Sequence, residues 1–368
     1  MSWSRRVARI ADFAERQLER ATAPGREGPA HVAFYRGFGT SSEIRVTGRV
    51  LRGAPTQPAI ADSSKWDNIV AALGRFESDE VPGARLRIEY GAAGEECVAD
   101  HEGYFTARIA SAPPPESTAA GTDWHPVRCA LLSPSGASAE GQVLVPRAGA
   151  RFGVISDLDD TVIRTGVRRV IRMLAATFLE NARTRLPFPG VAAFYHALQS
   201  PQAGTAQNPL FYVSSSPWNL HDYLVEFLQV RGIPVGPLML RDWGTSRDSL
   251  APPPHHVHKG ESIELILRTY PELPFILIGD SGQQDPEIYR EMVIRHPGRI
   301  PAVYIRDVTA NPLRAAEVKR LADEVRELGT AMVLTEDTIG AARHAAERGW
   351  IASDRVGAVE QEMHAADS

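Results

Sequence analysis

Five short, continuous apolar runs in the C-terminal half restrict the fold more than any other feature of the sequence. They alternate with segments in which apolar residues recur at helical spacing. An apolar run without polar alternation predicts a strand buried on both faces, as in a parallel sheet covered by helices. The five runs are Phe152–Ile155, Leu210–Val213, Phe275–Ile278, Ala302–Ile305 and Ala331–Leu334.

Polar side chains follow several of these runs at the point where each strand would end. Because the carboxyl ends of parallel strands form one edge, where ligands bind in such folds, we expect these side chains to meet. Asp157 and Asp159 are one residue apart and can point at one centre, either as a hard oxygen site for Mg²⁺ or with one of them as a nucleophile. The other candidates are Ser214, Ser215, Asp280, Asp285 and Lys259, which is expected to open an amphipathic helix.

These motifs together resemble the haloacid dehalogenase-like superfamily of aspartyl-phosphate phosphohydrolases. A narrower resemblance, to the catalytic domain of the actin-patch-type phosphatidate phosphatases, covers roughly Arg151 to Ile339. It rests on residues 156–161, 212–220, 258–259, 278–289 and 304–308. The resemblance implies a parallel Rossmann-like sheet with helices on both faces and a small cap. It also implies a phosphatase that depends on Mg²⁺ and converts phosphatidate to diacylglycerol.

Phosphate-ester hydrolysis needs a nucleophile, a proton donor for the leaving oxygen, and positive charge around the phosphoryl oxygens. Asp157 is the predicted nucleophile, and Asp159 the predicted acid and base, with a pKa raised by its acidic neighbours. Lys259 would hold Asp157 and the phosphate by charge. The Ser214 hydroxyl and the Ser215 amide would donate to phosphoryl oxygens.

The predicted cofactor is Mg²⁺, bridging Asp157, the phosphate and Asp280, with the backbone carbonyl of Asp159 as a further ligand. Two assignments stay open. Asp285 is expected either to bind the metal through water or to orient Lys259. Arg306, which follows the fourth run, is expected either to bind the substrate phosphate or to pair with its neighbour Asp307.

Two segments next to the motifs bear on the substrate. Val162–Pro189 mixes arginines with apolar residues, which fits a helix over the site or a core helix with a basic edge. Arg241–His258 is predicted to be a loop rather than a large cap. A small cap leaves the site open, which suits a lipid headgroup at a membrane surface and suits a phosphoprotein equally well.

The sequence divides into four predicted parts. Residues 1–30 are an amphipathic helix and linker, 31–150 a β-rich, sandwich-like accessory domain, 151–345 the catalytic domain, and 346–368 a C-terminal tail. The accessory domain is predicted from apolar residues that alternate with polar ones, interrupted by a helix over Ser63–Phe76.

Composition limits the partners and the location. The net charge of −5 gives no reason to expect nucleic acid as a partner. No apolar stretch reaches the ~20 residues of a membrane span, and Met1–Ala21 lacks the apolar core of a signal peptide. We therefore expect a cytoplasmic protein, in which the N-terminal helix docks on the protein or lies on a membrane surface. The oligomeric state is not predicted.

Two other functions fit the sequence. The same site could serve a soluble phosphate ester or a phosphoprotein. Alternatively, the chain could be a binding protein whose β-rich domain carries the function and whose catalytic half is degenerate.

Overall fold

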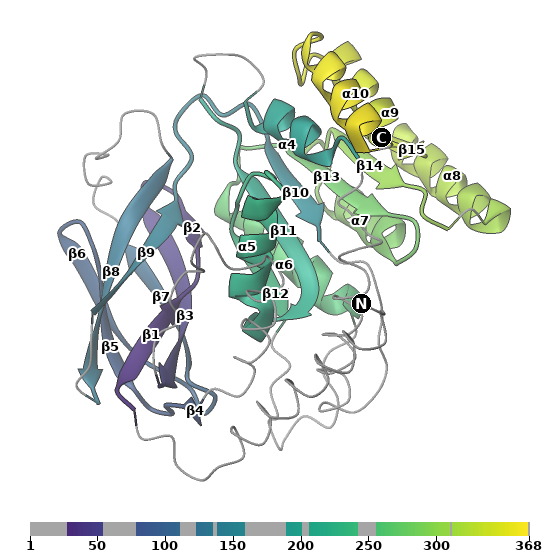
Figure 1. The fold of residues 1–368 in the computed structure, drawn as a ribbon. Helices are drawn as coiled ribbons and strands as arrows, with labels where there is room; N and C mark the ends of the chain where they lie inside the picture. Colours follow the sequence, from purple (N-terminus) through teal and green to yellow (C-terminus); the bar gives the residue numbers. More distant parts are fainter. Residues whose placement is uncertain are drawn as a thin grey trace, which may run out of the picture. The chain divides into compact units, whose positions relative to one another are not determined.

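A computed structural model shows two compact units, Met1–Val143 with Asn219–Leu224, and Leu144–Trp218 with Val225–Ser368 (Figure 1). The structure describes residues 28–53, 79–110, 123–134, 138–158, 189–200, 206–241, 255–309 and 311–366. Four predictions concern parts of the chain outside these ranges: the N-terminal helix, the helix over 63–76, the segment 162–188, and Asp159.

An antiparallel sheet forms the first unit. Among the described residues, nine strands join this sheet in the order β1-β3-β2-β9-β8-β5-β6, and β4 and β7 also pair with β3. The strands are β1 Ala30–Phe34, β2 Gly37–Gly39, β3 Glu43–Arg52, β4 Asp79–Glu80, β5 Arg85–Tyr90, β6 Ala93–Val98, β7 Tyr104–Ala110, β8 Trp124–Ser133 and β9 Ser138–Leu144. Burial alternates along β5, where Leu86, Ile88 and Tyr90 point inward. This alternation confirms the predicted antiparallel, β-rich character.

A parallel sheet forms the centre of the second unit. Among the described residues, six strands lie in the order β12-β11-β10-β13-β14-β15. They are β10 Gly153–Asp157, β11 Leu210–Pro217, β12 Leu238–Arg241, β13 Phe275–Asp280, β14 Ala302–Arg306 and β15 Ala331–Thr335. The first four residues of β10 and of β14 are all buried, as continuous apolar runs require. All five predicted strands are present, whereas β12, with only four residues, was not predicted.

The helices of the second unit form two groups. They are α4 Val191–Gln199, α5 His221–Val230, whose first four residues belong to the first unit, α6 His255–Thr269, α7 Asp285–Arg295, α8 Pro312–Glu327, α9 Thr338–Glu347 and α10 Arg355–Ala366. Helix α4 contacts α9 and α10, whereas α7 contacts α6 and α8. Crossovers between parallel strands are right-handed. The chain moves along the sheet in one direction from β10 to β12 and in the opposite direction from β13 to β15. The helices in these two connections therefore cover opposite faces of the sheet. Helix α10 lies in the segment predicted to be a tail.

The order of the strands marks where a ligand is expected. From β10 the chain runs outward to β11 and β12, then crosses back to β13 on the other side of β10. A parallel sheet binds ligands beyond the strand ends at such a reversal. None of the described helices combines the length and hydropathy needed to cross a membrane.

Candidate active site

Three carboxylates meet where β10 and β13 end. Asp157 and Asp280 are the last residues of these adjacent strands, and Asp285 is the first residue of α7. One oxygen from each of the three lies within 4.8 Å of the other two. The topology therefore brings together acids that are up to 128 positions apart in the sequence.

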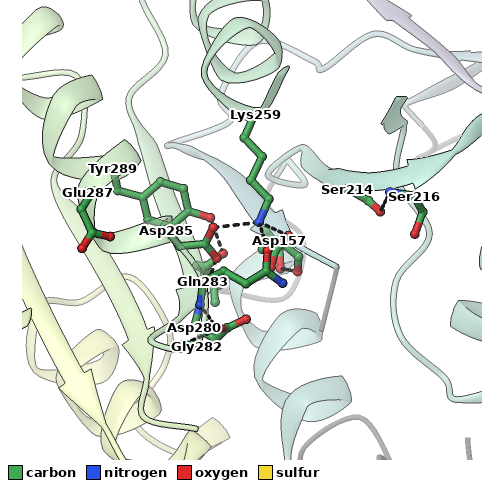
Figure 2. A network of polar contacts seen from close by, with 12 residues as sticks. Asp157, Ser214, Ser216, Lys259, Asp280, Gly282, Gln283, Asp285, Glu287 and Tyr289 are labelled. Carbon is green, nitrogen blue, oxygen red and sulfur yellow. Dashed lines mark hydrogen bonds and ion pairs between the residues drawn. The ribbon is translucent and has the colours of Figure 1, made fainter. Parts of the chain in front are cut away.

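Lys259 joins two of these carboxylates. Its Nζ lies 2.8 Å from Asp157 Oδ1 and 2.8 Å from Asp285 Oδ1, and it contacts Gln283 Oε1 at 3.4 Å (Figure 2). The side chains of the lysine and these two acids are at most 3% exposed. Because water is excluded, their charges interact strongly. The prediction that Lys259 opens its helix is wrong, since α6 begins at His255 and places Lys259 in the second turn.

The loop after β13 fixes the orientation of Asp280. Its Oδ1 accepts the amides of Gly282 at 2.7 Å and Gln283 at 3.2 Å. Asp285 Oδ2 accepts the amide of Asp280 at 3.2 Å. Of the two roles left open for Asp285, the structure shows the contact with Lys259. Burial, and then the neighbouring Asp285 carboxylate, raises the pKa of Asp280 above its ordinary value.

Gly279 allows this close approach of β13 and α7. A β-carbon at position 279 would lie 2.4 Å from Asp285 Oδ2, far inside van der Waals contact. Any side chain here would therefore displace the carboxylate that holds Lys259. A glycine between an apolar strand and an aspartate is thus required by geometry.

The serines lie at the end of the neighbouring strand. Asp157 pairs in register with Val213 on β11, so Ser214 follows one residue beyond it. Ser214 and Ser215 are buried, and Ser214 Oγ accepts the amide of Ser216 at 3.0 Å. Figure 2 shows Ser214 and Ser216 on the other side of Asp157 from Asp285. The structure thus places the predicted phosphate donors at the same edge of the sheet as the acids.

Arg306 ends β14 in register with Asp280. One of its guanidinium nitrogens lies 3.4 Å from Thr338 Oγ1, at the start of α9. Burial lowers the pKa of Arg306 to about 10, so the group keeps its charge at neutral pH. The side chain lines a cavity that Asp157 and Asp280 also line. Asp307 accepts a hydrogen bond from Ser281 Oγ at 3.0 Å.

Arg314 was not predicted from the sequence. It lies in the first turn of α8 and donates to the carbonyls of Ser281 at 2.9 Å and Gln283 at 2.6 Å. It also pairs with Glu287 of α7, and this pairing raises the pKa of Arg314. Arg314 therefore clamps the loop whose amides orient Asp280. It lies in an ordinary amphipathic helix outside every motif, so no sequence signal marks it.

The donor set of this cluster fits a hard divalent cation. Among the described residues, the grouped ligands are all carboxylates, without histidine or cysteine. Oxygen-only sites suit Mg²⁺ and Ca²⁺ rather than zinc. Asp157 and Asp280 are the natural direct ligands, because both oxygens of Asp285 already accept hydrogen bonds within the protein.

Comparison with known proteins bears directly on this region. Residues 152–307 match the family model for the catalytic domain of phosphatidate phosphatase APP1. The matched range contains every site residue described above except Arg314. The match supports the predicted resemblance to the phosphatidate phosphatases, and it does not include the β-rich unit.

Two curated relatives are similar over part of their length. Phosphatidate phosphatase APP1 of Saccharomyces cerevisiae is 30% identical over 194 residues, which cover 51% of this chain and 32% of that protein. An uncharacterized protein of Schizosaccharomyces pombe is 30% identical over 161 residues, covering 44% of this chain and 26% of that protein. The chain thus matches at most about a third of either relative.

The similarity of this chain to a solved structure is low. A carbohydrate acetylesterase from Xanthomonas citri aligns over 80% of this chain and 73% of its own, with 11% identity and a TM-score of 0.24. A similarity of this size does not establish a shared fold.

Proposed function

We propose that the chain is a phosphoric monoester hydrolase that converts phosphatidate, reached at a membrane surface, to diacylglycerol and phosphate. The observation that carries the proposal is the buried pairing of Lys259 with Asp157 and Asp285 beside Asp280. This pairing falls within the residues that match the catalytic-domain model. The substrate is inferred from that match and from the yeast relative's name.

The reaction would proceed through an aspartyl-phosphate, as in the haloacid dehalogenase-like enzymes. A carboxylate oxygen of Asp157 attacks phosphorus, and the bond between phosphorus and the glycerol oxygen breaks. The leaving oxygen takes a proton from Asp159, whose role rests on the sequence resemblance. Water then attacks the phosphorus of the acyl phosphate, Asp159 takes back a proton, and Asp157 is released.

Lys259, Ser214 and Ser215 would bind the phosphate. The Lys259 ammonium, 2.8 Å from Asp157 Oδ1, would orient Asp157 and attract the phosphate by its charge. The Ser214 hydroxyl and the Ser215 amide donate to phosphoryl oxygens from the β11 side of Asp157. Such fixed donors need no reorganisation as the reaction proceeds.

The proposed cofactor is Mg²⁺, which Asp157, Asp280 and the Asp159 carbonyl would hold directly and Asp285 would hold through a water molecule. When bound, the ion would offset the negative charge on the phosphoryl oxygens, which otherwise repels the Asp157 carboxylate from phosphorus. Asp280 is suited to this role because two amides already fix one of its oxygens.

Replacing Arg314 by Ala is expected to weaken Mg²⁺ binding about tenfold. Partners that orient metal ligands from outside the first shell typically contribute 10- to 100-fold to metal affinity. Without the guanidinium, the Ser281–Gln283 loop loses two bonds to its carbonyls, and Asp280 loses its fixed orientation. Titration calorimetry with Mg²⁺ alone measures the effect on the purified protein. Arg314→Lys is not expected to restore affinity, because one ammonium cannot reproduce the paired hydrogen bonds that the planar guanidinium donates.

The matched control for Arg314 is Arg290→Ala. Arg290 of α7 pairs with Glu324 of α8 at 2.5 Å, so it links the same two helices without contacting the loop. We expect its Mg²⁺ affinity to remain within twofold of wild type. Equal losses in both variants would mean that Arg314 acts only by joining the helices.

A substrate panel tests the proposed function. Phosphate release is measured with Mg²⁺ from phosphatidate in mixed micelles, from glycerol 3-phosphate and from a phosphopeptide, with the Asp157→Asn protein as the blank. Preferential release from phosphatidate is expected. Release only from a soluble ester or the peptide would remove the lipid assignment but keep the phosphatase. No release from any substrate would favour a binding protein with a degenerate catalytic half.

A further inference from the structure

A cavity extends from the acids into the second unit. It has a volume of about 210 Å³, and Asp157, Asp280 and Arg306 form part of its wall. The rest of its wall comes from α4, from α5 with the turn after it, from α9, and from the sheet. Helix α4 contacts α9 rather than the group of α6, α7 and α8. The cavity therefore lies on the face of the sheet opposite Lys259.

The wall of this cavity is largely apolar. Phe194 of α4 and Leu228 of α5 are at most 2% exposed, and Ile233 follows α5. Several polar groups in the wall have hydrogen-bond partners within the protein. The hydroxyls of Ser156 and Tyr195 lie 2.6 Å apart and share a hydrogen bond. A ligand inside the cavity therefore meets few groups that need a polar partner.

Further polar groups of the wall are also occupied. The Tyr212 hydroxyl donates to the Pro234 carbonyl at 2.6 Å. Asp337 Oδ1 accepts the Gly340 amide at 2.9 Å and so caps α9. The charged side chains of the wall are Asp157, Asp280 and Arg306, with Asp337 close enough to Arg306 for their charges to interact. A molecule with a phosphate at one end and a hydrocarbon at the other matches this distribution.

The size of the cavity limits the hydrocarbon that it can hold. Lining residues range from Tyr212 on β11 to Thr335 on β15, and these strands are four spacings apart. At ~4.8 Å per spacing, the lining extends over roughly 19 Å. Apolar cavities of about 150 Å³ hold a benzene ring. This cavity is slightly larger and borders Asp157, so it has room for the first few carbons of an acyl chain.

We propose that this cavity binds the first part of one acyl chain of the substrate while the phosphate lies at Asp157. The inference rests on the proposed phosphatase function and adds a chain-length preference to it. Each buried methylene is expected to raise kcat/KM roughly fourfold until the cavity is full. Adding four methylenes to the chain in the cavity then gives a ratio on the order of 10².

The test compares dibutyryl with dioctanoyl phosphatidate, each below the concentration at which it forms micelles. In the wild-type protein, the ratio of kcat/KM values, dioctanoyl over dibutyryl, is expected to be on the order of 10². Ala341 of α9 lines the cavity and is 5% exposed, so Ala341→Phe fills it and should lower the ratio at least tenfold. Val191→Trp, from the opposing α4, gives the same test if the first variant does not fold.

Ala346→Phe on the same helix is the matched control, because Ala346 does not line the cavity, and its ratio should equal that of wild type. A wild-type ratio within threefold of one would overturn the inference and leave the phosphatase intact. So would an unchanged ratio in both filled variants. Hydrolysis of glycerol 3-phosphate without hydrolysis of either phosphatidate would instead refute the lipid substrate, and the acyl site with it.

Discussion

Replacing Asp157 by Asn is expected to reduce phosphate release at least ~10³-fold. A neutral amide is a poor nucleophile toward phosphorus, and it cannot form the acyl phosphate that water resolves. The fold should survive, because Lys259 keeps its contact with Asp285 at 2.8 Å. Single-turnover assays with acid quench check this directly, because the wild-type protein should carry covalent phosphate and the variant none.

The control is Asp323→Asn, the same change at a carboxylate of α8 that is 68% exposed and pairs with Arg326. Its activity should match that of wild type. If Asp157→Asn kept more than a tenth of the wild-type rate, Asp157 would not be the nucleophile, and the proposed mechanism would fail.

Replacing Lys259 by Met is expected to affect both activity and stability. The change leaves Asp157 and Asp285 buried without their shared cation, and breaking a buried ion pair typically costs 3–5 kcal/mol. For a unit of 150–250 residues, the size range of the second unit, that corresponds to a fall of roughly 6–20 °C in melting temperature. Activity should fall by a factor on the order of 10³, because the variant loses the positive charge that faces the phosphate and the contact that positions Asp157.

Scanning calorimetry with and without Mg²⁺ separates these effects. A divalent cation held by the same carboxylates compensates part of the missing charge, so Mg²⁺ should restore more melting temperature in Lys259→Met than in wild type. Lys319→Met, at an exposed position on α8, is the control and should melt like wild type. An unchanged melting temperature in Lys259→Met would show that the lysine does not stabilise the acids.

The parallel sheet could be predicted because its strands are continuous apolar runs. Such runs need no knowledge of their partners, and β10, β11, β13, β14 and β15 all lie where they were expected. Strand β12 could not be predicted, because four residues are too few to show a pattern. Its place at the edge of the sheet follows only from its pairing with β11.

The acids could be predicted because a buried strand that ends in carboxylates conflicts with burial unless the site is functional. The parallel topology places the carboxyl ends of β10 and β13 side by side. This arrangement brings together Asp157, Asp280, Asp285 and Lys259. The clamp by Arg314 could not be predicted, since it depends on the angle at which α8 leaves β14. The cavity could not be predicted either, because its wall consists of residues with the pattern of an ordinary core.

The charges at the site fix the order in which its ligands can bind. The described acids Asp157, Asp280 and Asp285 outnumber the two described cations near them, Lys259 and Arg306. A phosphate monoester, itself an anion, is repelled by this excess until a divalent cation has bound. In the proposed reaction, the cation therefore binds first and the phosphate second. The rate toward any phosphate ester would then follow the free concentration of the cation, and without it the protein would leave such esters unbound.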